Sequence, residues 1–204
     1  MVNVTSVVCA RNENASTIIP AVRALRKTGK VYLVDDGGNS GLIRARLYAT
    51  VIPGPQTGKT DAMLTGLAQV KTERVIFADA DLTGFSKHHA RRLAEPHNGM
   101  IVGLRDNGSR WLGPWPPVSG ERSLPASIAE AALRSASPMG AETAINAAIG
   151  NSGLTVSTFV MKGVTNPSKE PLKRTGQVAA AASSHLLGLI RYLICWLKGA
   201  VRVH

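Results

Sequence analysis

The sequence contains little cysteine, few acidic residues and no long apolar run. Only Cys9 and Cys195 occur among 204 residues, which excludes a disulfide scaffold and predicts free thiols in a reducing compartment. The longest apolar stretch, residues 186–197, is too short to span a bilayer and is interrupted by Arg191. The first residues lack a basic leader followed by an apolar run, so no secretory signal is expected. These absences favour a cytoplasmic protein.

The residues that are present suffice for a folded core. Hydrophobic residues make up 44% of the chain, which excludes a disordered protein, and the length of 204 residues suits one domain. The sequence contains no internal repeat and no low-complexity linker. We therefore expect a single domain that spans residues 1–204.

Charge is unevenly distributed along the chain. The chain has 24 Lys and Arg residues and 13 Asp and Glu residues, for a formal net charge of +11. Glu170 is the only acid after residue 142. Five acids instead lie at the ends of apolar runs in the first half of the chain: Glu13, Asp35, Asp36, Asp79 and Asp81. This pattern indicates a carboxylate site inside a positive field, which would attract phosphates. A basic surface without a ligand is the alternative.

Strands and helices are predicted to alternate along the chain. Short apolar runs predict buried strands at residues 4–9, 30–34, 49–52, 74–78, 100–104 and 155–161. Apolar residues at helical spacing predict helices at residues 17–27, 42–48, 59–70, 86–95, 126–134 and 142–149, and at 173–204. Residues 106–125 are rich in Gly, Pro and Trp and predict a long ordered loop. The alternation indicates an α/β fold with a mostly parallel central sheet, whose ligand site lies beyond the carboxyl ends of the strands.

Residues 54–60, Gly-Pro-Gln-Thr-Gly-Lys-Thr, are one residue short of a phosphate-binding P-loop. That motif has four residues between its first Gly and the Gly-Lys pair, whereas this chain has three. Lys59 can still present a cation to a phosphate from the start of a helix. The segment therefore predicts a phosphate contact and not an ATPase.

Asp79 and Asp81 directly follow the expected strand at residues 74–78. Two carboxylates at this spacing can bind one ligand, with one on a divalent metal and the other on a ribose or on the same metal. Mg²⁺ and Mn²⁺ prefer carboxylate and phosphate oxygens. Surface loops contain many such pairs, so the motif gains weight from the polar motifs that precede it.

These motifs occur in a fixed order. They comprise Val-Val-Cys-Ala-Arg-Asn-Glu at residues 7–13, Leu-Val-Asp-Asp-Gly-Gly at 33–38, a Gly-Lys…Ala…Gly helix at 58–67, and the strand with its Asp-Ala-Asp at 75–81. Together they resemble family 2 glycosyltransferases of the GT-A fold. The resemblance covers residues 4–105 and continues more weakly through the Gly-Glu-Arg at 120–122 and the Gly-Ala-Glu at 140–142. It implies one GT-A-like domain in which residues 1–105 bind a nucleotide sugar, residues 106–172 face the acceptor and residues 173–204 form a C-terminal helix.

The resemblance also implies a nucleotide-sugar donor and a Mn²⁺ or Mg²⁺ ion. The residues implied to bind the donor are Ala10, Arg11, Glu13, Asp36, Lys59, Asp79 and Asp81. Asp36 would bond the base, usually uracil, Asp79 would lie near the ribose, and Asp81 would bind the metal, with Asp79 as a further candidate ligand. A divalent cation neutralises charge on the leaving nucleotide, which would give Asp81 a catalytic role. Helix capping or turn formation is the structural alternative for Glu13 and Asp35.

Glu142 departs from the pattern of the inverting members, in which an Asp follows the Glu and acts as the general base. Thr143 stands there in this chain, so either Glu142 serves as the base or the enzyme retains configuration, as some relatives with an isolated Glu do. A simple helix start is the structural alternative for Glu142. Relatives often supply a late His as a metal ligand, and no His stands near residues 164–166.

Two acceptors fit the sequence. The favoured one is a hydroxymethylated pyrimidine in DNA, as modified by phage enzymes, with Arg122, Trp111 and Trp115 as candidate acceptor contacts. The alternative is a lipid phosphate at a membrane surface, where the apolar segment 185–198 would lie in the interface. The structural alternatives are that the two Trp side chains anchor the loop and that the apolar segment is buried or forms a dimer contact. A binding protein without catalysis is disfavoured by the full set of acids.

Overall fold

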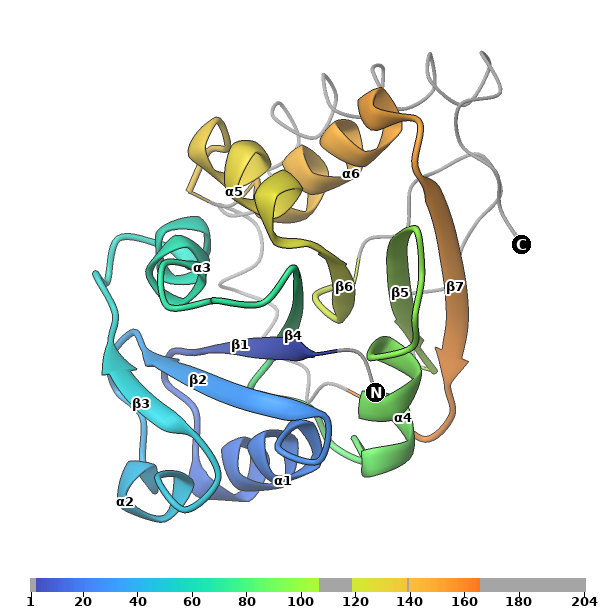
Figure 1. Ribbon diagram of the computed structural model, residues 1–204. Helices are drawn as coiled ribbons and strands as arrows, with labels where there is room; N and C mark the ends of the chain where they lie inside the picture. The colour runs from blue at the N-terminus through green and yellow to red at the C-terminus, as the bar shows by residue number, and fades with distance from the viewer. Residues whose placement is uncertain (1–2, 107–118, 139, 166–204) are drawn as a thin grey trace.

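The computed structural model describes residues 3–106, 119–138 and 140–165, which form one sheet with helices on both faces (Figure 1). The strands are β1 Val4–Ala10, β2 Gly29–Asp35, β3 Thr50–Pro53, β4 Arg74–Asp79, β5 Gly99–Arg105, β6 Arg122–Pro125 and β7 Thr155–Met161. The helices are α1 Ala15–Leu25, α2 Leu42–Ala45, α3 Lys59–Leu67, α4 Lys87–Leu93, α5 Ala126–Arg134 and α6 Ala141–Ser152. The strand order is β3-β2-β1-β4-β6-β5-β7.

One antiparallel strand interrupts an otherwise parallel sheet. β1 pairs in parallel with β2 and β4, β2 with β3, and β5 with β7, whereas β6 runs antiparallel between β4 and β5. The carboxyl ends of β1, β2 and β4 therefore lie at one edge, which we call the carboxyl edge. Because β6 runs the other way, its first residue, Arg122, pairs with Phe77 near the same edge.

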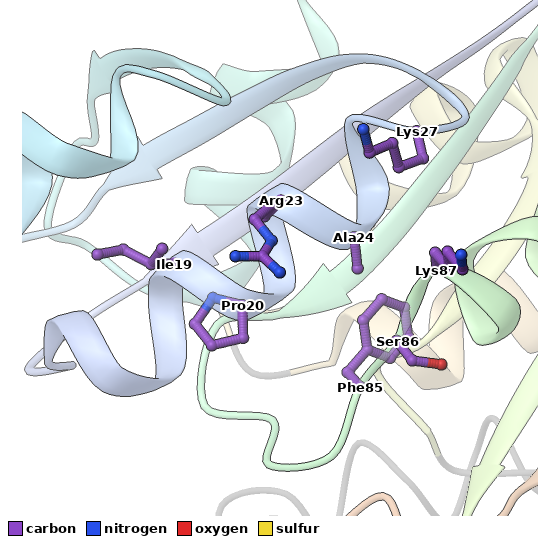
Figure 2. Close-up of a pocket in the computed structure, with 8 residues that line it drawn as sticks. All are labelled: Ile19, Pro20, Arg23, Ala24, Lys27, Phe85, Ser86 and Lys87. Atoms are coloured by element: carbon purple, nitrogen blue, oxygen red, sulfur yellow. The ribbon is translucent and has the colours of Figure 1, made fainter.

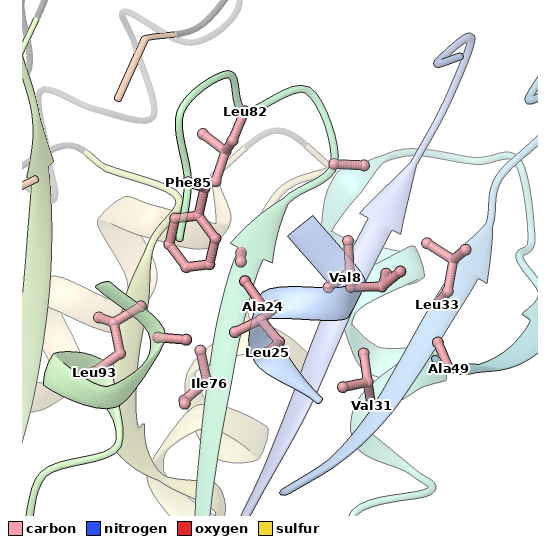
Figure 3. Packing of buried hydrophobic residues seen from close by; sticks show 14 of the residues in the cluster. Val8, Ala24, Leu25, Val31, Leu33, Ala49, Ile76, Leu82, Phe85 and Leu93 are labelled. Carbon is pink, nitrogen blue, oxygen red and sulfur yellow. The ribbon is translucent and has the colours of Figure 1, made fainter. Parts of the chain in front are cut away.

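The core has two layers because successive strand residues point to opposite faces of the sheet. Val8, Leu33 and Ile76 pack on the face covered by α1, α2 and α4, together with Leu25 and Leu93 (Figure 3). The other face packs against α3, α5 and α6. Its buried strand residues include Val7, Val34, Phe77 and Val102. With both faces covered, ligand contacts are left to the ends of the strands.

The α/β architecture with a mostly parallel sheet is confirmed, and each strand or helix expected before residue 162 is present. Three of the expected helices are shorter: α2 ends at Ala45, α3 ends at Leu67 and α4 spans only Lys87–Leu93. The expectation of a loop throughout 106–125 is wrong at its end, where β6 forms. Its sequence, Arg-Ser-Leu-Pro, has too little apolar character to indicate a strand, and its pairing with β4 and β5 defines it.

Some predictions lie outside the described residues. They concern Trp111 and Trp115, most of the 106–118 loop and the C-terminal helix expected at 173–204. Among the residues that the structure describes, no helix is long and apolar enough to cross a membrane.

Candidate active site

Acidic residues from separate motifs meet at the carboxyl edge, as the sequence predicted. The parallel register places Ala10 opposite Asp35 and Cys9 opposite Asp79. Lys59 begins α3 and reaches the same edge. Burial raises the pKa of the Cys9 thiol to about 12, so this residue is neutral and is not a candidate nucleophile.

Lys59 bridges two carboxylates that are far apart in the sequence. Its Nζ donates to Asp79 Oδ1 at 2.8 Å and to Glu142 Oε1 at 2.5 Å. Burial alone would lower the pKa of Lys59, but the two carboxylates raise it above its ordinary value. Lys59 is therefore a fixed positive charge, and its bridge between two carboxylates was not indicated by the sequence.

Asp79 ends β4 and is held from two sides. Lys59 binds one carboxylate oxygen, and the Arg105 guanidinium, at the end of β5, donates to the other. Burial would raise the pKa of Asp79, but these two cations hold it well below its ordinary value. Gly120 lies against the carboxylate, since a Cβ there would lie 2.5 Å from Asp79 Oδ2. Asp79 is thus an ionised, tightly packed acceptor.

Arg105 and Glu121 belong to the cluster although sequence reasoning did not select them. Arg105 Nε donates to Glu121 Oε2 at 2.9 Å, and Nη2 donates to Oε1 at 2.8 Å. Glu121 is fully buried, and Ser119 Oγ donates to its Oε2 at 2.7 Å. Burial raises the pKa of Glu121, and the Arg105 charge opposes that rise. The one available sequence signal was the position of Arg105 at a strand end.

Glu142 lies in the first turn of α6 and faces Lys59. Burial would raise its pKa, but Lys59 and Arg122 lower it below the ordinary value. Arg122 is fully buried, and its guanidinium donates to the backbone oxygens of Ser119 and Glu142 and to Asn146 Oδ1. Arg122 therefore holds the start of α6. None of these contacts supports the predicted acceptor role of Arg122.

The loops after β1 and β2 form the other half of the edge. Asp36 is buried, accepts from the Gln56 backbone N at 2.6 Å, and lies 3.9 Å from Arg11 Nη1. Asn12 and Gln56 have φ of 57° and 61°, a left-handed conformation that is uncommon outside glycine and concentrates at functional sites. The structure thus places Asp36 and Arg11 together, as predicted.

Asn39 ties these two loops together, and the sequence did not reveal it. Its Oδ1 accepts from the Glu13 backbone N at 2.8 Å, and its Nδ2 donates to the Ala10 carbonyl and to Asp35 Oδ1. Asp35 also accepts from the Gly37 backbone N at 3.2 Å. Both contacts of Asp35 lie within the turn that follows β2, so they match the alternative in which Asp35 forms the turn.

The donor set at the carboxyl edge fits a cation that is shared with a substrate. Among the described residues, no group of three or more His, Cys, Asp or Glu side chains could hold a metal by itself. Lys59 and Arg105 bind Asp79, and their positive charges would repel a metal ion there, so Asp81, buried two residues further on, is the better candidate ligand. Mg²⁺ in phosphate-binding enzymes is held by one or two carboxylates together with substrate oxygens.

A pocket of about 540 Å³ lies elsewhere, between α1 and the start of α4 (Figure 2). Arg23, Lys27 and Lys87 line it together with apolar groups such as Pro20 and Phe85. It contains none of the acids described above, and its walls are helical surfaces. Converging charged groups of both signs therefore place the candidate site at the carboxyl edge.

The sequence of residues 5–147 matches the family model described as glycosyl transferase family 2. The chain belongs to this family. The matched region contains Asp36 and Asp81 and the whole ion-paired cluster from Lys59 to Glu142. The protein is therefore a glycosyltransferase, as the resemblance of its motifs implied.

Solved structures agree on the fold. Glucosyl-3-phosphoglycerate synthase from Mycobacterium tuberculosis, in complex with Mn²⁺, uridine diphosphate and glucosyl-3-phosphoglycerate, superposes with a TM-score of 0.70 at 16% identity, covering 92% of this chain and 80% of that one. The same enzyme with Mg²⁺ and uridine diphosphate superposes with a TM-score of 0.67 at 17% identity, covering 92% of this chain and 79% of that one. A mycobacterial protein of known structure superposes with a TM-score of 0.72 at 14% identity, covering 92% of this chain and 74% of that one. No curated protein sequence matches the chain.

Proposed function

We propose that this glycosyltransferase uses a uridine-diphosphate sugar together with Mn²⁺ or Mg²⁺. The observation that carries the proposal is the partly buried cluster at the carboxyl edge, where Lys59 and Arg105 enclose the carboxylate of Asp79. Such a site combines cations for a diphosphate with an ionised acceptor for sugar hydroxyls. The complexes of the structurally similar synthase with uridine diphosphate and Mn²⁺ or Mg²⁺ support the same donor and ion.

In this proposal the donor lies across the ends of β1, β2 and β4. The base contacts Asp36, and Ala10, Arg11 and Glu13 line the nucleotide pocket. The ribose hydroxyls donate to Asp79, Lys59 faces the diphosphate, and Asp81 holds the cation. When bound, the cation neutralises charge on the leaving diphosphate. In this proposal residues 1–105 hold the donor, and the acceptor binds on the side of the residues that follow.

Glu142 is proposed to orient the transferred sugar and not to act as a general base. Its lowered pKa makes it a weak proton acceptor at neutral pH, and its Oε1 is bound by Lys59. A reaction that retains configuration needs no such base, because the proton of the acceptor hydroxyl passes to the leaving phosphate oxygen. Of the two alternatives for Glu142, this one agrees better with its ion pair.

The acceptor is proposed to be a hydroxymethylated pyrimidine in DNA. The net charge of +11 supports a polyanionic partner, as do the basic residues Arg23, Lys27 and Lys87 around the pocket between α1 and α4. Transfer to a polyprenyl-phosphate lipid is the second candidate, and the apolar segment 185–198 supports it. Trp111 and Trp115 keep their proposed place as contacts for an unstacked base.

Mass spectrometry of nucleosides tests this proposal. DNA that contains 5-hydroxymethylpyrimidines is incubated with the protein, Mn²⁺ and a set of uridine-diphosphate sugars, with Asp81→Ala as the matched inactive variant. A sugar-sized mass gain with the wild-type chain alone supports both donor and acceptor. A parallel reaction offers polyprenyl phosphate as the acceptor. If the DNA gains no mass and the lipid phosphate receives the sugar, the DNA acceptor is excluded in favour of the lipid.

A further inference from the structure

We propose that Glu121 is a positioning residue that acts through Arg105 to keep the carboxylate of Asp79 available to the donor ribose. This inference deepens the proposed function and rests on it. Glu121 does not face the donor side directly, since it is fully buried, and its contacts run to Arg105, to Ser119 and to the Asp79 backbone N at 3.5 Å.

The guanidinium of Arg105 is shared between two carboxylates. Its Nε and Nη2 each donate to one oxygen of Glu121, and Nη2 also donates to Asp79 Oδ2. This two-point pairing with Glu121 fixes the plane of the guanidinium, because the donors of Arg form a rigid fork. Asp79 therefore receives one N–H group from Arg105 and one from Lys59, which leaves it acceptor capacity on both oxygens.

Without the charge of Glu121, the same guanidinium would be free to turn its whole fork toward Asp79. The carboxylate would then be saturated by Arg105 and Lys59, and a ribose hydroxyl would have to displace one of them. Gly120 strengthens this argument because the absence of a side chain there brings segment 119–121 directly against the Asp79 carboxylate. Glu121 is thus placed to hold Arg105 back from Asp79.

Stability alone does not account for this arrangement. Buried ion pairs contribute little to stability on average, since desolvation offsets their attraction, and apolar replacements are often neutral. Glu121 is fully buried, so the folded protein also bears the free-energy cost of removing a carboxylate from water. A role in donor binding explains why two cations and three carboxylates are gathered at this edge.

Calorimetric titration with uridine diphosphate in the presence of Mn²⁺ tests the role, because it measures affinity and the fraction of competent protein separately. Glu121→Gln keeps the shape of the side chain, and we expect its Kd for uridine diphosphate to rise about 10-fold at unchanged stoichiometry. The matched control is Glu130→Gln, which removes a similar but exposed pair with Arg134 and should leave Kd unchanged. Reduced stoichiometry at the wild-type Kd would show a merely structural role and overturn the inference.

A second arm asks whether Glu121 acts through Arg105. In an Arg105→Met background, Glu121→Gln should cause no further rise in Kd, whereas an equal rise in both backgrounds would overturn the inference. Urea unfolding of the donor-free protein tests the linkage independently: the effects of Glu121→Gln and Asp79→Asn should be non-additive, and additive effects would contradict it. A wild-type chain that binds no uridine diphosphate would contradict the proposed donor, and the unfolding cycle would still decide the linkage.

Discussion

Replacing Lys59 with Met should destabilise the protein strongly at neutral pH and much less in acid. Lys59 Nζ lies 2.8 Å from Asp79 Oδ1 and 2.5 Å from Glu142 Oε1, and the Glu142 side chain is only 14% exposed. Removing one partner of a buried ion pair costs about 3–5 kcal/mol. Because Asp79 keeps Arg105, we expect the lower end of this range, about 3 kcal/mol at pH 7.5.

The pH dependence follows from the pKa of Glu142. In the wild-type chain this pKa lies below its unfolded value, so the pair contributes stability above the unfolded pKa and loses it as pH falls through the folded pKa. In Lys59→Met the main lowering charge is gone, and we expect burial and the charge of Asp79 to outweigh Arg122 and raise the pKa of Glu142 above its unfolded value. The variant then gains stability as pH falls, because protonation removes the buried charge.

Urea unfolding of both proteins at pH 7.5 and pH 5 measures this effect. The difference in the free energy of unfolding between wild type and variant should shrink at pH 5. Lys87→Met, which removes an exposed cation that lines the pocket between α1 and α4, is the matched control and should change little at either pH. A difference for Lys59→Met that is below about 1 kcal/mol, or equal at both pH values, would refute the reasoning.

Three further predictions concern the same edge and its partners. Gly120→Ala should lower the free energy of unfolding by about 1–3 kcal/mol, because its Cβ would lie 2.5 Å from Asp79 Oδ2; unchanged urea unfolding would show that the edge is loosely packed. Asp81→Asn should abolish the dependence of uridine-diphosphate binding on Mn²⁺, whereas Asp79→Asn should weaken binding but keep that dependence; calorimetry with and without the ion separates them. Binding to DNA should weaken steeply between low and physiological salt in a fluorescence-anisotropy titration, and a flat response would exclude a phosphate-dominated interaction.

The sequence predicted the framework of the site because local signals carried it. Asp35, Asp36 and Asp79 follow apolar runs, and parallel strands necessarily bring such ends to one edge. Lys59 was predicted beside a phosphate from its position at the start of a helix. These predictions depended on residues a few positions apart, where pattern and geometry are closely linked.

The interior of the cluster could not be predicted, because it depends on long-range pairing. Arg105 meets Glu121 only because β6 inserts antiparallel between β4 and β5, and β6 carries no apolar alternation. Arg122 was interpreted as an acceptor contact from its motif, whereas the structure buries it beneath α6. A charged residue inside a sheet gives the same sequence signal as one on a surface loop.

A crystal structure of the protein grown with uridine diphosphate and Mn²⁺ would test the central claim most directly. We predict the nucleotide at the carboxyl edge, with its base against Asp36, its ribose on Asp79 and the ion between Asp81 and the diphosphate. Nucleotide bound instead in the pocket between α1 and α4, or an ion that Asp81 does not hold, would contradict it.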